Sequence, residues 1–181
     1  PDVNAQIEAL GIRSLAAHPS DADLVSLQAD DVVIVPAFGA EVSVIDAVKG
    51  HGCQIIDTTC GDVMSVWKRV RQNATERVTS IIHGKASHEE TRATASRALG
   101  QDGLGHYLIV FNLADAEAVA DFMVHGGDAG QFLARFRGAT SPGFDPLTHL
   151  ERVGVANQTT MLRSETEAIQ NLLREAVARR D

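Results

Sequence analysis

The sequence has 181 residues, of which 44% are hydrophobic and 22% are charged. A chain of this length and composition can bury a substantial core, which excludes an unfolded, collagen-like or coiled-coil protein. The 24 acidic and 16 basic residues leave a formal net charge of −8, so the chain has no broad positive field for non-specific nucleic-acid binding. Anionic ligands must therefore be held by local groups.

The sequence also argues against a membrane span and a secretory signal. Its strongest apolar run, Val32–Val35, is followed at once by Pro36 and is far shorter than the roughly 18 apolar residues that a spanning helix needs. The first residues lack the positive and apolar regions of a signal peptide. The two cysteines, Cys53 and Cys60, allow one disulfide at most, which favours a reducing compartment. We expect a soluble protein with neither membrane nor nucleic acid as a partner.

Short runs with strand composition alternate with amphipathic stretches along the chain. The predicted strands are Val32–Val35, Gln54–Asp57, Ser80–His83, Tyr107–Phe111 and Arg152–Ala156, with a weaker one at Ile12–Ala16. The helical patterns between them are Val42–Val48, Val63–Val70, Glu89–Leu99 and Ala116–Met123. This order predicts an α/β fold of parallel sheets with flanking helices. The continuous apolar character of Val32–Val35 favours a strand that is buried on both sides.

The last predicted helix has a clear start signal. Ser164 and Glu167 have the spacing of a capping box, and Ala168, Leu172 and Ala176 continue one apolar face. Three arginines near the end suit the negative end of the helix dipole: Arg174, Arg179 and Arg180.

Two other stretches bear on domain organisation. Gly126–Pro146, which is rich in glycine and surrounds Phe132–Phe136, interrupts the alternation and predicts an inserted helix and loop. A weak boundary near Gly61 divides the chain into part of a first α/β unit, residues 1–61, and a second unit, residues 62–181.

Reactive side chains gather where predicted strands end. The loops concerned are Pro36–Gly39, Thr58–Asp62, Gly84–Thr91 and Asn157–Thr160. Because the carboxyl ends of parallel strands meet at one edge of a sheet, where helix N-termini also point, ligands bind there. The sequence therefore predicts one site built from Cys60, His88, Glu90 and Thr159.

Each of these residues also has a simpler interpretation. Cys60 precedes a predicted helix, whose dipole favours the thiolate and hence either metal ligation or nucleophilic attack. His88 alone is compatible with an ordinary surface or core histidine, Glu90 with a helix-dipole partner and Thr159 with a turn residue. Cys53, which precedes an apolar strand, is most simply a small buried hydrophobe. The convergence of the four loops favours the functional interpretation.

Five stretches of the chain together carry a family resemblance. They are P-A-F-G-A (Pro36–Ala40), D-T-T-C-G-D-V-M-S-V-W-K-R-V (Asp57–Val70), I-I-H-G-K-A-S-H-E-E-T-R-A-T (Ile81–Thr94), S-P-G-F-D-P (Ser141–Pro146) and V-A-N-Q-T-T-M-L-R-S-E-T (Val155–Thr166). In this order the chain resembles the 4-hydroxy-3-methylbut-2-enyl diphosphate reductase family, also called IspH or LytB, and most of all its long cyanobacterial and plant plastid branch.

The resemblance implies the last step of the non-mevalonate isoprenoid pathway, in which an allylic hydroxyl is removed reductively to give isopentenyl and dimethylallyl diphosphates. It implies a 4Fe–4S cluster held by three cysteines, of which Cys60 matches the second. By the same match His88 binds the substrate, Glu90 supplies protons and Thr159 hydrogen-bonds the substrate hydroxyl. Ferredoxin or flavodoxin is the implied electron donor, and the bacterial cytoplasm or the plastid stroma is the implied compartment.

The departures from the family pattern predict that the chain is an internal fragment of a three-unit, trefoil-like enzyme. Residues 1–4 match a P-x-V-N sequence that follows the first cluster cysteine and a histidine in the family, and both of these are missing. The third cysteine and a Ser-x-Asn diphosphate segment belong to a third unit that is absent here. Phe38 stands where the short branch has a substrate histidine, and it should not be given that role. His83 and Lys85 receive no role from the sequence.

Two other functions remain as alternatives. Cys60, His88 and Glu90 have the residue types of a cysteine-nucleophile hydrolase. A non-catalytic α/β module that binds only phosphate is the second alternative, since one cysteine cannot hold a cluster. Iron and sulfide in the full-length protein separate the reductase from the hydrolase, whereas the phosphate-binding module can describe the isolated chain even when its parent is an enzyme.

Overall fold

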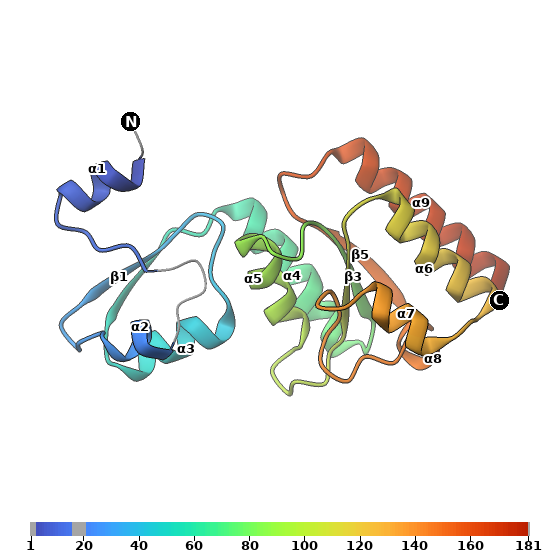
Figure 1. Cartoon of the computed structure of the whole chain (residues 1–181), viewed down its shortest axis with the longest axis horizontal. Coiled ribbons are helices and arrows are strands. Elements are labelled where there is room, and N and C mark those ends of the chain that lie inside the picture. Colours follow the sequence, from blue (N-terminus) through green and yellow to red (C-terminus); the bar gives the residue numbers. More distant parts are fainter. Residues whose placement is uncertain (1–2, 16–20, 181) are drawn as a thin grey trace. The chain divides into compact units, whose positions relative to one another are not determined.

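The computed structural model describes residues 3–15 and 21–180, which form two units (Figure 1). The first unit comprises Pro1–Ile34 and Ser43–Ile56, and the second comprises Val35–Val42 and Asp57–Asp181. All four predicted site residues belong to the second unit.

The first unit is a small two-stranded α/β arrangement. Its elements are α1 (Val3–Ala9), α2 (Asp21–Val25), β1 (Val32–Val35), α3 (Val42–Gly50) and β2 (Gln54–Asp57), the ends of β1, α3 and β2 extending into the second unit. β1 pairs with β2. A core of Leu27, Val48 and Cys53 lies beneath the sheet, and Val33 and Ile55 pack against it. Cys53 is thus a buried hydrophobe, as the sequence predicts.

Two strand predictions for this unit are wrong. Val32 and Ile34 are each 53% exposed, so β1 is not buried on both sides. The reason is that alternate residues of a strand face opposite sides and only the Val33 side of this sheet is covered by the core. The weak strand at Ile12–Ala16 does not form over residues 12–15, which have no regular structure, and Ala16 lies outside the described residues.

The second unit is a three-stranded parallel sheet with helices on both faces. Its elements are α4 (Gly61–Thr75), β3 (Thr79–His83), α5 (Glu89–Ala98), β4 (Tyr107–Val110), α6 (Leu113–His125), α7 (Ala129–Arg135), α8 (Pro146–His149), β5 (Val153–Asn157) and α9 (Arg163–Arg180). The strand order is β4-β3-β5. Every strong strand and helix prediction for this part is confirmed to within a few residues at its ends.

Strand alternation explains how helices cover the two faces of this sheet. Ile81 of β3 packs into a cluster with residues of α6 and α9, whereas its neighbour Ile82 packs with residues of α4 and α5. Figure 1 shows α6 and α9 side by side on one face of the sheet. The central strand β3 is buried along its whole length, as expected for a parallel strand covered on both faces.

The last helix differs from its prediction in two respects. α9 begins at Arg163, so Ser164 lies inside the first turn and does not cap it. Glu167 instead pairs with Arg163, with 2.8 Å between Nε and Oε1. The buried face is also displaced by one residue along most of the helix, and it consists of Thr166, Ile169, Leu173 and Ala176.

The insertion predicted at Gly126–Pro146 is confirmed as α7 with the loop after it. Asp128 caps α7 by accepting a hydrogen bond from Gln131 N. Asp145 caps the short α8, which follows the loop and places Pro146 in its first turn.

The register of the sheet brings the site loops together. β3 runs parallel to β5 with His83 opposite Asn157, and parallel to β4 with His83 opposite Val110. The loops that begin at Gly84 and Gln158 therefore leave the sheet at the same level, at its carboxyl edge.

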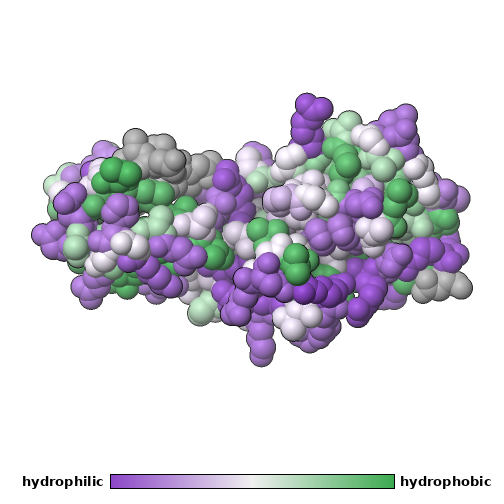
Figure 2. Space-filling model, turned by 90° about the horizontal axis from the view of Figure 1, so that it is seen from below, coloured by the Kyte–Doolittle hydropathy of each residue, from purple (hydrophilic) through white to green (hydrophobic). Residues whose placement is uncertain are grey.

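The surface is mixed in character. On the face drawn in Figure 2, hydrophilic residues cover most of the surface, and hydrophobic residues are scattered among them. Within the described residues, no helix is both long enough and apolar enough to cross a membrane.

Candidate functional site

Glu90 and Thr159 form the centre of the candidate site. Glu90 lies in the first turn of α5 and is 3% exposed. Its Oε1 accepts a hydrogen bond from the backbone N–H of Thr159 at 2.5 Å, and its Oε2 accepts one from the Thr159 hydroxyl at 3.0 Å. A carboxyl group joined to a hydroxyl in this way can pass a proton through that hydroxyl to a third group.

His88 is tied to the same helix start. It is the N-cap residue of α5, and its Nδ1 accepts a hydrogen bond from the backbone N–H of Glu90 at 3.2 Å. A ring nitrogen that accepts a hydrogen bond carries no proton, so in the neutral ring the proton lies on Nε2. His88 is half-buried and can offer this Nε2–H to an anionic ligand.

Gln158 connects the two loops, and the sequence did not single it out. Its buried Oε1 accepts hydrogen bonds from the Thr91 hydroxyl at 3.0 Å and from Lys85 N at 3.2 Å. Its Nε2 donates to the Thr160 hydroxyl at 2.6 Å. Gly84 makes room for this network, because a Cβ there would lie 2.7 Å from the Thr91 hydroxyl. The loop that leads to His88 and the start of α5 is therefore joined by hydrogen bonds to the loop that contains Thr159.

Cys60 lies at the start of α4, the helix that packs against α5. It is the N-cap residue, its thiol is exposed, and its side chain makes no capping hydrogen bond. The backbone N–H of Cys60 donates to Ala37 O at 2.9 Å. The sulfur of Cys60 is therefore accessible to a ligand from outside the helix.

The turn before Cys60 is held by Asp57. Its Oδ1 accepts hydrogen bonds from the Thr59 hydroxyl at 2.6 Å and from Thr59 N at 2.9 Å. These two bonds lower the pKa of Asp57, the hydroxyl having the larger effect. The turn thus fixes the backbone from which the cysteine extends.

Three of the four predicted residues are joined directly. Hydrogen bonds connect His88 to Glu90 and Glu90 to Thr159, whereas none of those found in the described part of the chain joins the Cys60 side chain to them. Residues 3–15 and 21–180 also contain no group of three or more His, Cys, Asp or Glu side chains arranged to hold a metal ion. Cys53 cannot help, because its buried thiol donates to Gln28 O within the first unit. Within the described residues, Cys60 therefore forms no metal site with other His, Cys, Asp or Glu side chains.

His83, at the end of β3, is fully buried and has a structural role. Its Nδ1 lies 2.8 Å from the Thr166 hydroxyl, with which it shares a hydrogen bond. Burial lowers the pKa of His83, and the Glu165 carboxylate, 3.6 Å from Nε2, opposes this shift. The ring fastens the central strand to α9.

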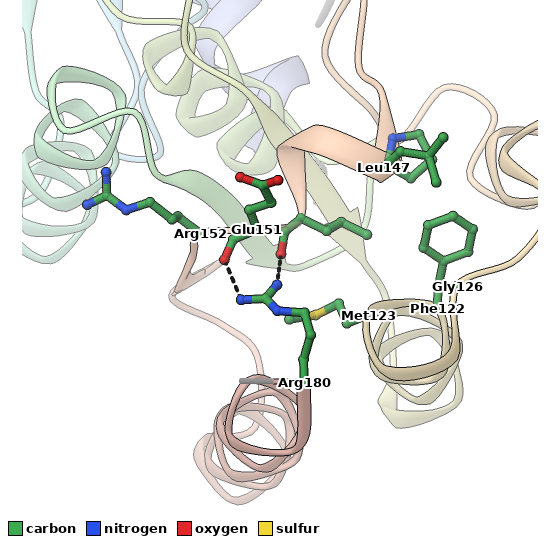
Figure 3. A pocket seen from close by; sticks show the side chains of 9 residues that line it. Phe122, Met123, Gly126, Leu147, Glu151, Arg152 and Arg180 are labelled. Atoms are coloured by element: carbon green, nitrogen blue, oxygen red, sulfur yellow. Dashed lines mark hydrogen bonds between the residues drawn. The ribbon is translucent and has the colours of Figure 1, made fainter.

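A cavity of about 540 Å³ lies apart from these residues. Phe122, Met123 and Leu147 line it, and Arg180 closes one side by donating to the carbonyls of Leu150 and Glu151 (Figure 3). None of the four predicted site residues lines it. The candidate site therefore lies outside this cavity, in the loops at the carboxyl edge of the sheet.

Comparison with known proteins assigns the chain to a family. The LytB protein family matches residues 1–180. The 4-hydroxy-3-methylbut-2-enyl diphosphate reductase of Rippkaea orientalis is 48% identical over 172 residues, which cover 95% of this chain and 41% of that protein. The enzyme of the same name from a Synechococcus strain is 45% identical over 180 residues, which cover 99% of this chain and 43% of that protein. The chain thus spans less than half the length of these relatives.

Solved structures show the same fold. A structure of (E)-4-hydroxy-3-methyl-but-2-enyl diphosphate reductase, the terminal enzyme of the non-mevalonate pathway, matches with a TM-score of 0.60 and 22% identity, covering 96% of this chain and 48% of that one. The corresponding reductase from Plasmodium falciparum matches with a TM-score of 0.60 and 20% identity, covering 87% of this chain and 40% of that one.

Proposed function

We propose, from the premise that this chain belongs to the LytB protein family, that the protein containing it is a 4-hydroxy-3-methylbut-2-enyl diphosphate reductase. The observation that carries the proposal is the buried Glu90 carboxyl, whose two oxygens both accept hydrogen bonds from Thr159. This pair stands beside His88 at the carboxyl edge of a parallel sheet, where α/β proteins bind ligands.

The reaction removes an allylic hydroxyl with two electrons and two protons. The carbon–oxygen bond breaks, the oxygen leaves as water, and isopentenyl or dimethylallyl diphosphate remains. Hydroxide is a poor leaving group, so a proton must reach the oxygen as the bond breaks. The Thr159 hydroxyl gives its proton to the departing oxygen and takes one from protonated Glu90, with which it is already in hydrogen-bond contact.

The other residues bind the substrate and the cofactor. His88 donates its Nε2–H to the diphosphate, while its Nδ1 keeps the start of α5 in place. Cys60 would hold one iron of a 4Fe–4S cluster with its exposed sulfur. When bound, such a cluster would supply the electrons and Lewis-acid assistance to the loss of the hydroxyl.

Several further assignments belong to the proposal. In the three-unit enzyme that the family resemblance implies, residues 1–61 correspond to part of the first α/β unit and residues 62–181 to the second, although the contacts of Cys60 place it with residues 35–42 and 57–181. The other two cluster cysteines come from the rest of the protein. Ferredoxin or flavodoxin donates the electrons, and the bacterial cytoplasm or plastid stroma is the compartment. The hydrolase has less support, because no hydrogen bond in the described part of the chain links the Cys60 thiol to a base, and the phosphate-binding module has less support because the named relatives are reductases.

The test uses the full-length protein, reconstituted with iron and sulfide without oxygen. With a chemical reductant, it should convert 4-hydroxy-3-methylbut-2-enyl diphosphate into the two five-carbon diphosphates and contain four irons per chain. Cys60→Ser should lose iron and turnover, whereas Cys53→Ser, at a buried cysteine outside the site, should retain both. A full-length protein that binds no iron but hydrolyses esters or amides through Cys60 would refute the reductase and support the hydrolase.

A further inference from the structure

We propose that Arg97 is a positioning residue, which fixes the segment Val35–Val42 on α5 and, through that segment, holds Cys60 in place relative to Glu90. Three sets of contacts within the second unit carry this inference. They link Cys60 to the segment, the segment to α5, and Arg97 to the aromatic ring of Trp67.

The segment holds the backbone just before α4. Ala37 O accepts the hydrogen bond from Cys60 N at 2.9 Å. Two residues earlier, Val35 O accepts from Thr58 N at 3.1 Å and from the Thr58 hydroxyl at 2.6 Å. Any displacement of residues 35–37 would therefore move the backbone that carries the cysteine.

The far end of the segment is fastened to one stretch of α5. Arg97 donates from a terminal guanidinium nitrogen to Ala40 O at 2.8 Å, and Val42 N donates to the Ser96 hydroxyl at 3.1 Å. Arg92 adds an ion pair with Glu41 at 2.8 Å. Of the three α5 residues that make these contacts, Arg92, Ser96 and Arg97, only Arg97 is buried, with 8% exposure.

Arg97 is held by more than this one bond. The same nitrogen donates to Ala93 O at 2.8 Å, and the guanidinium lies 3.3 Å from the centre of the Trp67 ring. Burial, assisted by the charge of Arg71, lowers the pKa of Arg97 to about 10, so the side chain remains charged at neutral pH. A buried cation with these contacts is strongly oriented.

Trp67 also explains the glycine in the segment. Gly39 has a φ of +80°, and a Cβ on it would lie 2.3 Å from the indole ring. The segment therefore packs directly on the ring that supports Arg97. A longer side chain at position 39 would push the segment off this surface.

This inference rests on the proposed function, in which Glu90 donates the proton and Cys60 binds iron, so their relative position affects the rate. Glu90 and Arg97 stand on the same helix, about 10 Å apart along its axis at 1.5 Å per residue. One rigid helix thus carries the proton donor at its start and the segment that fixes the iron ligand near its end. Displacing a reacting group by about 1 Å can reduce the rate about 100-fold.

The experiment compares Arg97→Met with Arg71→Met in the full-length protein. Arg71 is the matched control because its guanidinium lies 6.0 Å from the same Trp67 ring and it is exposed. Hydrogen exchange is followed for the amides of residues 37–42, and alkylation of Cys60 in the cluster-free protein is followed by peptide mass spectrometry, with buried Cys53 as the internal reference. Turnover and KM are measured on the reconstituted enzyme.

Arg97→Met should raise exchange in residues 37–42 about tenfold, consistent with the loss of a buried charged hydrogen bond. It should change the alkylation rate of Cys60 but not that of Cys53, and it should lower kcat about 100-fold with little change in KM. Arg97→Lys should recover part of the loss, because lysine retains the charge but not the planar contact. Arg71→Met should behave as wild type.

Wild-type exchange and alkylation in a folded Arg97→Met protein would overturn the inference. If that variant does not fold, Ser96→Ala, which removes only the acceptor of Val42 N–H, should raise exchange at Val42, and unchanged exchange there would equally refute it. If the wild-type protein lacks reductase activity while the exchange and alkylation effects are present, the positioning role stands and the proposed function fails. Normal turnover in Arg97→Met with an active wild type refutes the positioning role alone.

Discussion

Glu90 is a nearly buried carboxyl group that depends on one partner residue. Removing a carboxylate from water is costly unless hydrogen bonds replace the lost hydration. Thr159 provides two of them, one from its backbone and one from its hydroxyl. The backbone bond survives any substitution at position 159 except proline, whereas the hydroxyl bond does not. The hydroxyl is therefore the removable link of the proposed proton path.

His88 caps α5, and substitution can separate this role from the proposed binding of diphosphate. His88→Asn should keep the N-cap of α5 and the melting temperature, because asparagine is a good capping residue. His88→Ala should lose about 1 kcal/mol of stability with the cap. Both variants should raise the KM for the diphosphate substrate about 10- to 100-fold, since each removes the proposed Nε2–H donor. Thermal melts and steady-state kinetics on both variants check this, and an Asn variant with wild-type KM would show that His88 is only a cap.

Residues at this scale differ in how far sequence predicts them. His88, Glu90 and Thr159 could be proposed because they stand in loops after predicted strands. Gln158 could not, because its role depends on Thr91, 67 residues away in the chain. Hydrogen bonds between distant side chains depend on the register of the strands, and hydrophobic patterning alone does not determine that register.

At the scale of elements, strand burial is predicted correctly where both faces of the sheet are covered and wrongly where only one face is. The parallel strands of the second unit have helices on both faces and a strong apolar signal, so their positions could be predicted. The apolar run of β1 gave the same signal but lies in a sheet with only one face covered. The capping-box pattern of Ser164 and Glu167 predicts a later start for α9 than the observed Arg163. The pattern does not distinguish a glutamate that caps the helix from one that pairs with an arginine four residues earlier, as Glu167 does with Arg163.

The contact of Gly39 with Trp67 predicts a large loss of stability in Gly39→Ala. The alanine would have to adopt a φ of +80° and would collide with the ring, so we expect a loss of about 2 to 4 kcal/mol. Gly61→Ala, at the first position of α4, is the control, since no atom lies within 4 Å of a Cβ there. Chemical denaturation gives the free energy of unfolding of both variants. Equal values for Gly39→Ala and Gly61→Ala would show that residues 35–42 can move away from Trp67 at little cost.

For the whole molecule, the buried His83 and the half-buried His106 set a pH dependence. Burial lowers the pKa of His83 and of His106 from 6.5, and the neighbouring His149 lowers that of His106 further. As the pH falls below about 6.5, these histidines take up protons in the unfolded chain before they do so in the folded chain. Stability is therefore fully present above about pH 6.5 and is lost as the pH falls through the lowered values.

Melting temperatures of the full-length protein between about pH 7.5 and pH 5 test this dependence. The decrease on acidification should be smaller in His83→Gln than in wild type, and smaller still when His106→Gln is added. A decrease of the same size in all three proteins would show that other groups control the acid response.

The cluster of the proposed enzyme needs more ligands than the described residues offer. One exposed thiol cannot hold a 4Fe–4S cluster, and the relatives are more than twice as long as the matched region. Under the proposed function, residues 57–181 would provide the proton-delivering pair Glu90 and Thr159, the diphosphate-binding His88 and one cluster ligand, Cys60. The loops that carry these residues could be predicted from the alternation of strands and helices, whereas the reductase function and the missing cluster ligands follow only from the family resemblance.

The most direct test of this account is the turnover of Glu90→Gln in the full-length protein. Glutamine retains the size and most of the hydrogen bonding of Glu90 but has no proton to transfer, so kcat should fall about 100- to 10,000-fold with little change in KM or in the melting temperature. If Glu90 served only to stabilise the start of α5, the loss would be under about 1 kcal/mol and would appear in stability. Near-normal turnover with a lowered melting temperature would contradict the assignment of Glu90 as the proton donor.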